Sequence, residues 1–136
     1  MTDPGAPRPL TALDRDTALG LLGGERIGRL AYCVDSRPHL EVVNFVLAGE
    51  RVIFRIAVSA KLVALGRGVP FAVQADRLDA DNRTGWTVTV VGPARAMTAA
   101  EIDRLDESPQ PWIEEERPRY VALTIHQVHG RMLSAG

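Results

Sequence analysis

The chain has 136 residues, of which 46% are hydrophobic and 24% are charged, and its formal net charge is −1. This balance is typical of an ordinary soluble globular protein, and the length indicates a single domain that can bury a sizeable core. A net charge near zero argues against a general nucleic-acid binder. No apolar run approaches the length of a membrane span, and the polar, proline-containing N-terminus is not a signal peptide. We therefore expect a cytoplasmic protein without nucleic-acid or membrane partners.

The first part of the chain predicts a tail, a helix and three strands. Residues 1–9 contain three prolines and predict a disordered tail, followed by one domain over residues 10–136. The residues from Thr11 to Asp14 resemble a capping box, and the helix expected after them ends at Gly23 and Gly24. Strands are predicted over residues 27–34, 39–47 and 51–57. Their short connections predict an antiparallel meander.

The joint after the third predicted strand carries three candidate site residues. Arg55, Ser59 and Lys61 lie where this strand is followed by a short helix, predicted over residues 61–65 from Leu62 and Leu65. A helix N-terminus presents free backbone N–H groups and the positive end of the helix dipole. Cations beside such an end indicate a seat for a phosphate, with ordinary surface charges as the alternative.

The second half of the chain predicts three more strands. A fourth strand is expected over residues 69–76, a polar loop over 77–85, and a long fifth strand over 86–97 with a bulge or bend at Gly92 and Pro93. Thr98 and Glu101 form a capping box that opens a helix, and residues 106–118 are irregular. A sixth strand is expected over 120–125, and residues 126–133 either continue it or follow it closely. Six strands with little helix indicate a small closed barrel.

Other chemistry-bearing residues are better explained by structural roles. Cys33 is the only cysteine, which excludes an intrachain disulfide, and its apolar strand predicts a small core residue. The three histidines show no metal-ligand spacing, so we expect no metal site, and His129 is the only one considered near a site. No catalytic acid or base is assigned. Trp86 and Trp112 are expected as hydrophobic anchors at a dimer contact.

Several short motifs follow one another in a specific order along the chain. They are Gly28-Arg29-Leu30-Ala31, Val43-Asn44-Phe45, Phe54-Arg55 through Lys61-Leu62, Gly85-Trp86-Thr87-Val88, Pro111-Trp112 and His129-Gly130-Arg131. This order resembles the pyridoxamine 5′-phosphate oxidase-like family of FMN-binding split barrels, over about residues 10–133. The resemblance implies a mainly β fold, a six-stranded antiparallel split β-barrel with a few short helices. It also implies a homodimer with two FMN sites at the subunit interface.

The resemblance implies a role for each residue of the cofactor site. Arg55 and Lys61 correspond to ligands of the FMN phosphate. Val43 and Asn44 would lie along the edge of the isoalloxazine ring, and Trp86 near the dimer interface and one flavin. The full set of cofactor-binding residues implied is Val43, Asn44, Arg55, Ser59, Lys61, Leu62 and Trp86.

The chain departs from the family pattern in the phosphate cradle. Relatives commonly show Thr-Ala-x-Gly-(Ser or Thr)-Lys after the arginine, whereas this chain has a run from Ile56 to Lys61 that reads Ile-Ala-Val-Ser-Ala-Lys. Ile56 and Ala60 therefore lack two expected hydroxyl donors, and Ser59 replaces the glycine. Each lost hydrogen bond to a charged group costs about 1.5–3 kcal/mol.

The resemblance implies a flavin-dependent oxidoreductase that acts on a small organic substrate. The flavin would carry the redox chemistry, and the protein would bind and orient it. True pyridoxamine phosphate oxidation is not expected, because the chain is short and shows no motif for a substrate phosphate. Two alternatives stay open. The barrel binds another cofactor, the deazaflavin F420 or haem, or it is a cofactor-free dimeric barrel that binds a ligand, which the missing hydroxyls favour.

Overall fold

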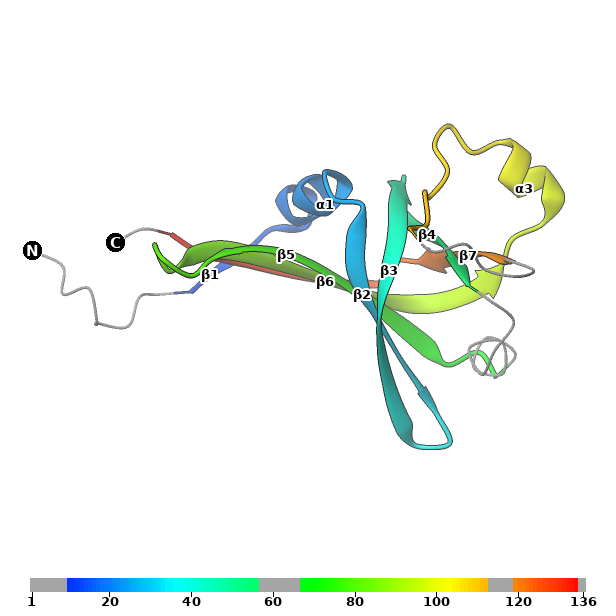
Figure 1. The fold of residues 1–136 in the computed structure, drawn as a ribbon, viewed down its shortest axis with the longest axis horizontal. Coiled ribbons are helices and arrows are strands. Elements are labelled where there is room, and N and C mark those ends of the chain that lie inside the picture. Colours follow the sequence, from blue (N-terminus) through cyan, green and yellow to red (C-terminus); the bar gives the residue numbers. More distant parts are fainter. Residues whose placement is uncertain (1–9, 57–66, 113–118, 135–136) are drawn as a thin grey trace, which may run out of the picture.

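A computed structural model describes residues 10–56, 67–112 and 119–134, and Figure 1 shows a twisted β-structure with two short helices at its periphery. The elements in chain order are β1 (Thr11–Leu13), α1 (Arg15–Gly23), β2 (Ile27–Val34), β3 (Arg37–Ala48), β4 (Arg51–Ile56), β5 (Pro70–Asp79), β6 (Thr84–Ala96), α3 (Ala99–Asp103), β7 (Arg119–Thr124) and β8 (Gln127–Leu133). Among the described residues, no helix is long and apolar enough to cross a membrane.

Six antiparallel strands close the barrel. Their order is β6-β5-β2-β3-β4-β7, and β7 pairs back onto β6. The predicted six-stranded antiparallel split barrel is therefore confirmed. Gln127–Leu133 form a separate strand, β8, which pairs with β6 outside the barrel, and β1 extends the sheet beyond β8.

One glycine allows β6 to pair with two different strands along the same edge. Residues 85–91 of β6 pair with β8, and residues 94–96 pair with β7. Gly92 lies between these two regions, where a Cβ atom would collide with the carbonyl oxygen of Thr124. The barrel therefore closes at the point where the sequence predicts a bulge or bend.

Alternate residues of the barrel strands fill a continuous core. Phe45, Phe54 and Phe71 are among its largest fully buried side chains, and α1 closes one end through Ala18 and Leu22. Strand alternation directs one set of side chains inward and leaves the other set on the outer surface.

A second, smaller cluster lies on the outer face of β3, β4 and β7. Val46, Ile53 and Ala122 pack there against Met97 and against Ile102 of α3. Thr98 caps α3 in a capping box with Glu101, as the sequence predicts. Glu101 also accepts hydrogen bonds from Arg95 (2.6 and 2.8 Å), which fasten the helix to β6. This cluster holds α3 against the barrel, and the segment that follows α3 continues to the candidate site.

The capping box predicted at Thr11 is wrong. Residues Thr11–Leu13 form β1, which pairs with β8, and the N-cap of α1 is Asp14. The Asp14 carboxylate accepts a 2.8 Å hydrogen bond from the backbone N–H of Thr17. Pairing with the distant strand β8 satisfies backbone groups that the local pattern would otherwise assign to a helix start.

The polar loop predicted over residues 77–85 is too long. Strand β5 continues to Asp79 and β6 begins at Thr84, so the two strands form a hairpin. The Asp79 carboxylate accepts hydrogen bonds of 3.1 Å from the backbone N–H groups of Asp81 and Asn82 and thereby closes the turn. The polar side chains reflect the exposure of this end of the hairpin, not an absence of strand.

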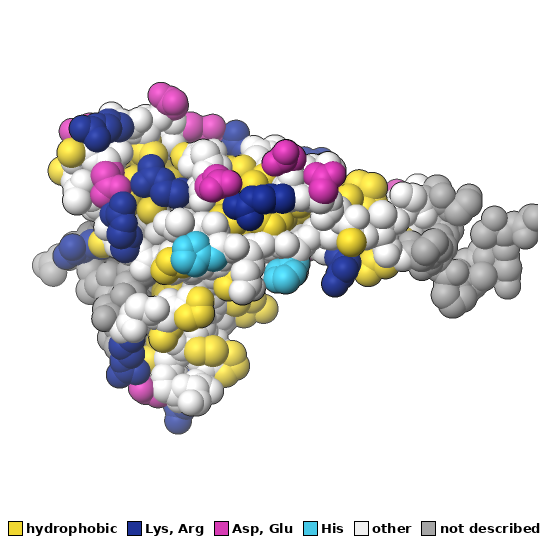
Figure 2. Space-filling model, turned by 180° about the vertical axis from the view of Figure 1, so that it is seen from behind, with side chains coloured by type: hydrophobic (Ala, Val, Ile, Leu, Met, Phe, Trp, Pro, Cys, Tyr) yellow, Lys and Arg dark blue, Asp and Glu magenta, His cyan; other side chains and the backbone are white. Residues whose placement is uncertain are grey.

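The β2–β3 hairpin projects beyond the barrel. Figure 1 shows it at the lower side, and Figure 2 shows apolar side chains gathered on the same projection seen from behind. Cys33, predicted in the core, is exposed on this hairpin, because it lies opposite Pro38 on the outer face.

An aromatic stack supports the inner face of this hairpin. The Tyr32 ring stacks against Phe71 and His39, with centroids 5.2 and 4.9 Å away. The Tyr32 hydroxyl donates to the carboxylate of Glu41 at 3.0 Å. Burial and this neighbouring carboxylate raise the pKa of Tyr32 to about 12, so the hydroxyl keeps its proton at neutral pH.

Candidate functional site

The candidate site lies where strands β3 and β4 separate. The ladder between them ends at the pair Phe45↔Phe54. Within the described residues, β3 then continues as the partner of β2, and β4 continues as the partner of β7. Asn44 and Arg55 are the first residues on the two sides of this separation, which we call the fork.

Arg55 brings an unpaired cationic donor to the fork. Its side chain points out of the barrel, because its strand neighbours Phe54 and Ile56 are fully buried in the core. Its guanidinium carbon lies 5.4 Å from the centroid of the Tyr120 ring, a cation–π geometry. The Nε of Arg55 is buried and has no hydrogen-bond partner in the described structure. An unpaired buried donor costs about 1–3 kcal/mol, so this nitrogen fits an acceptor that the described residues do not supply.

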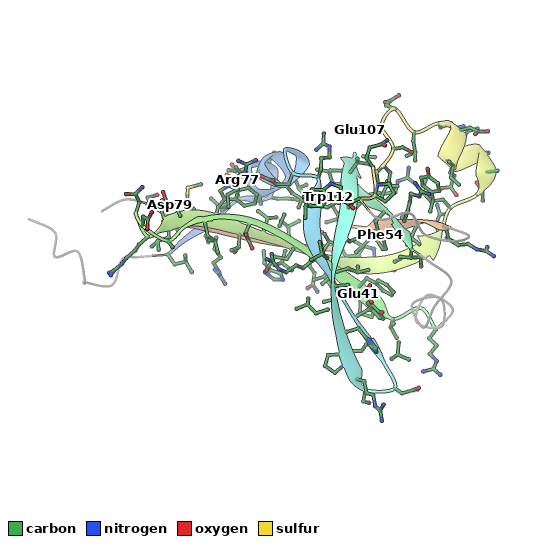
Figure 3. The ribbon with its side chains drawn as sticks, in the orientation of Figure 1. Glu41, Phe54, Arg77, Asp79, Glu107 and Trp112 are labelled. Atoms are coloured by element: carbon green, nitrogen blue, oxygen red, sulfur yellow. The ribbon has the colours of Figure 1, made fainter. Side chains whose placement is uncertain are left out.

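The segment that follows α3 bridges the two branches of the fork. The Asn44 Oδ1 accepts a 3.0 Å hydrogen bond from the backbone N–H of Trp112. In the same segment, the Ser108 Oγ lies 3.2 Å from the Tyr120 hydroxyl. One contact therefore reaches β3 and the other reaches β7, and Figure 3 shows Trp112 beside β3.

The edge of β3 at the fork presents backbone groups. The N–H of Phe45 donates to the carbonyl of Arg26 at 3.0 Å, so the main chain of Phe45 faces β2. Main-chain N–H and C=O groups point to alternate sides along an antiparallel strand. Those of Asn44 and Val42 therefore point away from β2, to the edge of β3 that β4 no longer pairs with. Those of Val43 face β2, and the Val43 side chain is buried in the core. Polar contacts to a ligand are therefore available at Asn44 and Val42, with Val43 beneath them.

Large apolar side chains surround the fork. Ile27 lies opposite Asn44 on β2, and Leu40 and Val42 share the face of Asn44 on β3. Their exposed fractions are 39% for Ile27, 70% for Leu40, 72% for Val42 and 79% for Trp112. These four residues form what we call the apolar patch. Exposed apolar residues that lie together beside unpaired polar groups indicate a surface that a ligand or a partner covers.

A second cation lies on the same face but is already paired. Arg29 lies opposite Val42 on β2 and forms an ion pair with Asp76 at 3.2 Å. In the described structure, the charge on Arg29 is thus partly neutralised, whereas the Arg55 guanidinium lies over the Tyr120 ring and its Nε has no hydrogen-bond partner.

The structure brings only some of the predicted cofactor residues together. Asn44 and Arg55 meet at the fork, and Val43 lies beneath them. The fully buried Ile56 side chain cannot face the ligand of Arg55. The remaining predicted residues of the phosphate cradle, Ser59, Ala60, Lys61 and Leu62, lie outside the described residues.

Trp86 lies apart from Arg55. It shares the inner face of β6 with Val88 and packs against the main core near α1. Its predicted place near a flavin depends on a second copy of the chain and stays a prediction. Tyr120 and Ser108 are contacts of the fork that sequence reasoning missed, because nothing local to either residue indicates which strand it faces.

The described residues show no further reactive cluster at the fork. They contain no group of three or more His, Cys, Asp and Glu side chains that could hold a metal ion. His129 lies opposite Thr89 on β6, separated from the fork by β5 and β2. The described residues of the fork thus supply a cationic donor and hydrogen-bonding groups, and they position no acid or base in it.

The fold is a split barrel, and an unpaired cationic donor lies at the fork where its β3–β4 ladder ends. The sequence model of the pyridoxamine 5′-phosphate oxidase family matches residues 14–132. The chain belongs to this family.

Known relatives span nearly the whole chain. The uncharacterized protein Rv0080 of Mycobacterium tuberculosis is 33% identical over 133 residues, which cover 93% of this chain and 88% of the relative. The FAD binding protein from Mycobacterium smegmatis is 28% identical with a TM-score of 0.74, over 91% of this chain and all (100%) of that one. The protein of unknown function DIP1874 from Corynebacterium diphtheriae is 30% identical with a TM-score of 0.73, over 93% of this chain and 99% of that one. More distant structures, below 25% identity, include an FAD-binding protein from Mesorhizobium loti and an FAD and heme binding protein from M. smegmatis, and they show the fold alone.

Proposed function

We propose that the fork binds a phosphorylated flavin, FMN, and that the protein is a flavin-dependent oxidoreductase acting on a small organic substrate. The observation that carries this proposal is the buried, unpaired Nε of Arg55 at the fork of a family split barrel. The planar guanidinium of arginine presents several N–H donors in a geometry that matches a phosphate group. The flavin, when bound, supplies the redox chemistry, and the chain supplies binding, orientation and exclusion of water.

Each part of the fork has a role in this proposal. Arg55 binds the phosphate, together with Lys61 and Ser59 of the predicted cradle. The Asn44 amide and the backbone of Val42 bind the polar edge of the ring. The apolar patch covers the ring, because an isoalloxazine presents a large flat surface that is mostly apolar. The proposal needs only one phosphate, and FMN and FAD both carry it next to the ribityl chain.

A second copy of the chain is part of this proposal. One copy leaves the apolar patch open, with Val42 and Trp112 both more than two-thirds exposed. A homodimer that closes over the patch removes this apolar surface from water and buries the ligand between the subunits. In this arrangement Trp86 lies near the dimer interface, close to the flavin of one subunit.

The experiment is to identify what the protein carries and what Arg55 does for it. The absorbance spectrum of the purified protein distinguishes flavin, deazaflavin and haem, and the mass of the released compound distinguishes FMN from FAD. Titration of the apoprotein with FMN then gives an affinity for the wild type and for the Arg55→Ala/Lys61→Ala double variant. We expect a flavin spectrum and weaker binding in the double variant. Unchanged affinity in that variant rules out the phosphate assignment, and a colourless protein that takes up no FMN supports the cofactor-free alternative.

A further inference from the structure

Arg55 is held by an aromatic ring, whereas another arginine of the same strand is held by a carboxylate. Arg51, four positions earlier on the same strand, is fixed by an ion pair with Glu101 at 3.3 Å. Arg55 instead lies against the ring of Tyr120, its register partner on β7. Its buried Nε remains without a hydrogen-bond partner among the described residues. The two arginines thus show two ways of fixing a cation, by a carboxylate and by an aromatic face.

The Tyr120 ring is itself well anchored. Its backbone carbonyl accepts a 2.9 Å hydrogen bond from the N–H of Met97, in addition to the β4–β7 ladder. The ring packs against the outer cluster of Val46 and Ile53. The hydroxyl lies 3.2 Å from the Ser108 Oγ. The ring is therefore a fixed platform beneath the guanidinium.

An aromatic platform and a carboxylate have different consequences for anion binding. A carboxylate occupies the N–H edge of a guanidinium and neutralises its charge, so an incoming phosphate must displace it. An aromatic ring attracts the cation through its face and leaves the N–H edge unoccupied. A guanidinium held this way keeps both its charge and its donors for the ligand.

We infer that Tyr120 is a positioning residue for the cofactor phosphate. Its ring orients the Arg55 guanidinium toward the fork without neutralising it. This inference rests on the proposed function, because it assigns to Tyr120 an effect on the phosphate alone. It therefore predicts that Tyr120 acts on flavins that carry a phosphate and not on riboflavin, which lacks one.

The experiment compares the dissociation constants of FMN and riboflavin for the same apoprotein. The dissociation constant of riboflavin divided by that of FMN measures what the phosphate contributes to binding. We expect Tyr120→Leu to lower this ratio by about 2- to 30-fold, the range that corresponds to a cation–π contact, and to leave the riboflavin constant within about 2-fold of wild type. Arg55→Ala lowers the ratio at least as much. Tyr120→Phe, the matched control, keeps the ring and keeps the ratio within about 2-fold of wild type.

The outcomes separate this inference from the function on which it rests. If Tyr120→Leu weakens FMN and riboflavin equally, the residue has a structural role only and the inference is overturned. If the wild type shows no preference for FMN over riboflavin, or binds neither, the proposed phosphate site is overturned and the inference with it. Should the leucine variant fail to fold, Tyr120→Val, which is β-branched and suits a strand, replaces it in the same comparison.

Discussion

Replacing Arg55 by methionine should have opposite effects on stability and on flavin binding. The buried Nε without a partner costs the ligand-free protein about 1–3 kcal/mol. The contact with the Tyr120 ring, at 5.4 Å, stabilises the wild type by about 0.5–1 kcal/mol, and the variant loses this contribution. Methionine has a similar length, brings no polar group, and gains about 0.3–1.5 kcal/mol from a sulfur–aromatic contact with the same ring. Together these contributions make the ligand-free variant more stable than wild type by about 0.3–4 kcal/mol.

The same substitution should weaken flavin binding strongly. It removes a charge-assisted hydrogen bond worth about 1.5–3 kcal/mol, which corresponds to about 10- to 150-fold in the dissociation constant of FMN. Most single substitutions lower both stability and binding, so a change of opposite sign in the two quantities identifies a residue whose donors serve a ligand.

Two measurements and one control variant test this prediction. Urea unfolding of the apoprotein gives the free energy of unfolding, and quenching of flavin fluorescence gives the dissociation constant. Arg51→Met is the control, because Arg51 lies on the same strand but is already paired with Glu101. It should lower stability slightly and leave flavin affinity unchanged. The reasoning is refuted if apo Arg55→Met is less stable than wild type by more than about 1 kcal/mol.

Three further predictions concern barrel closure, acid stability and assembly. Gly92→Ala should lower the free energy of unfolding by about 1–3 kcal/mol or more, because the added Cβ collides with a carbonyl of β7. Gly20→Ala is the control: it lies in open space on α1 and should raise the free energy of unfolding by about 0.5–1 kcal/mol. Denaturant unfolding measures both changes. Hydrogen bonds from Arg95 hold the pKa of Glu101 below its ordinary value of 4.5. The ionised carboxylate therefore stabilises the fold above that pH and loses its effect as the pH falls through the lowered pKa, so Glu101→Gln should reduce the melting temperature at pH 7, with a difference from wild type that narrows in acid. Val42→Glu should convert the proposed dimer to monomer in sedimentation, since it places a charge in the apolar patch, and a dimer that persists contradicts the assembly proposed.

The barrel strands could be predicted because their side-chain pattern is local. Apolar runs bounded by turn residues indicate β2 and β4, Val and Thr content indicates β6, and short connections favour antiparallel pairing. Strand β1 could not be found this way, because Thr11–Leu13 is a strand only through its pairing with β8 near the other end of the chain. The extension of β5 to Asp79 was missed for a related reason, since the polar composition of an exposed hairpin end resembles that of a loop.

The site was only partly predictable for the same reason. Arg55 was found because a motif carries it, but its contact with Tyr120 depends on the register between β4 and β7. A shift of one residue in that register would place Arg119 or Val121 opposite Arg55 instead, so no pattern within either strand determines the contact. Once β7 is known to pair with β4, the burial of Val121 fixes which face Tyr120 occupies.

The fork lies where the β3–β4 ladder ends. Beyond the pair Phe45↔Phe54 both strands continue, but β3 pairs with β2 and β4 pairs with β7, so among the described residues β3 presents an unpaired edge there. An exposed edge favours unwanted pairing with other chains, and natural proteins normally shorten it, charge it or cover it. Here the edge lies beside a buried unpaired nitrogen of Arg55 and beside the exposed Val42 and Trp112. Each of the three features is unfavourable in an isolated chain, and one covering ligand shared with a second subunit would satisfy all of them. Their coincidence at the fork is therefore a stronger argument for a binding site than any one of these features taken separately.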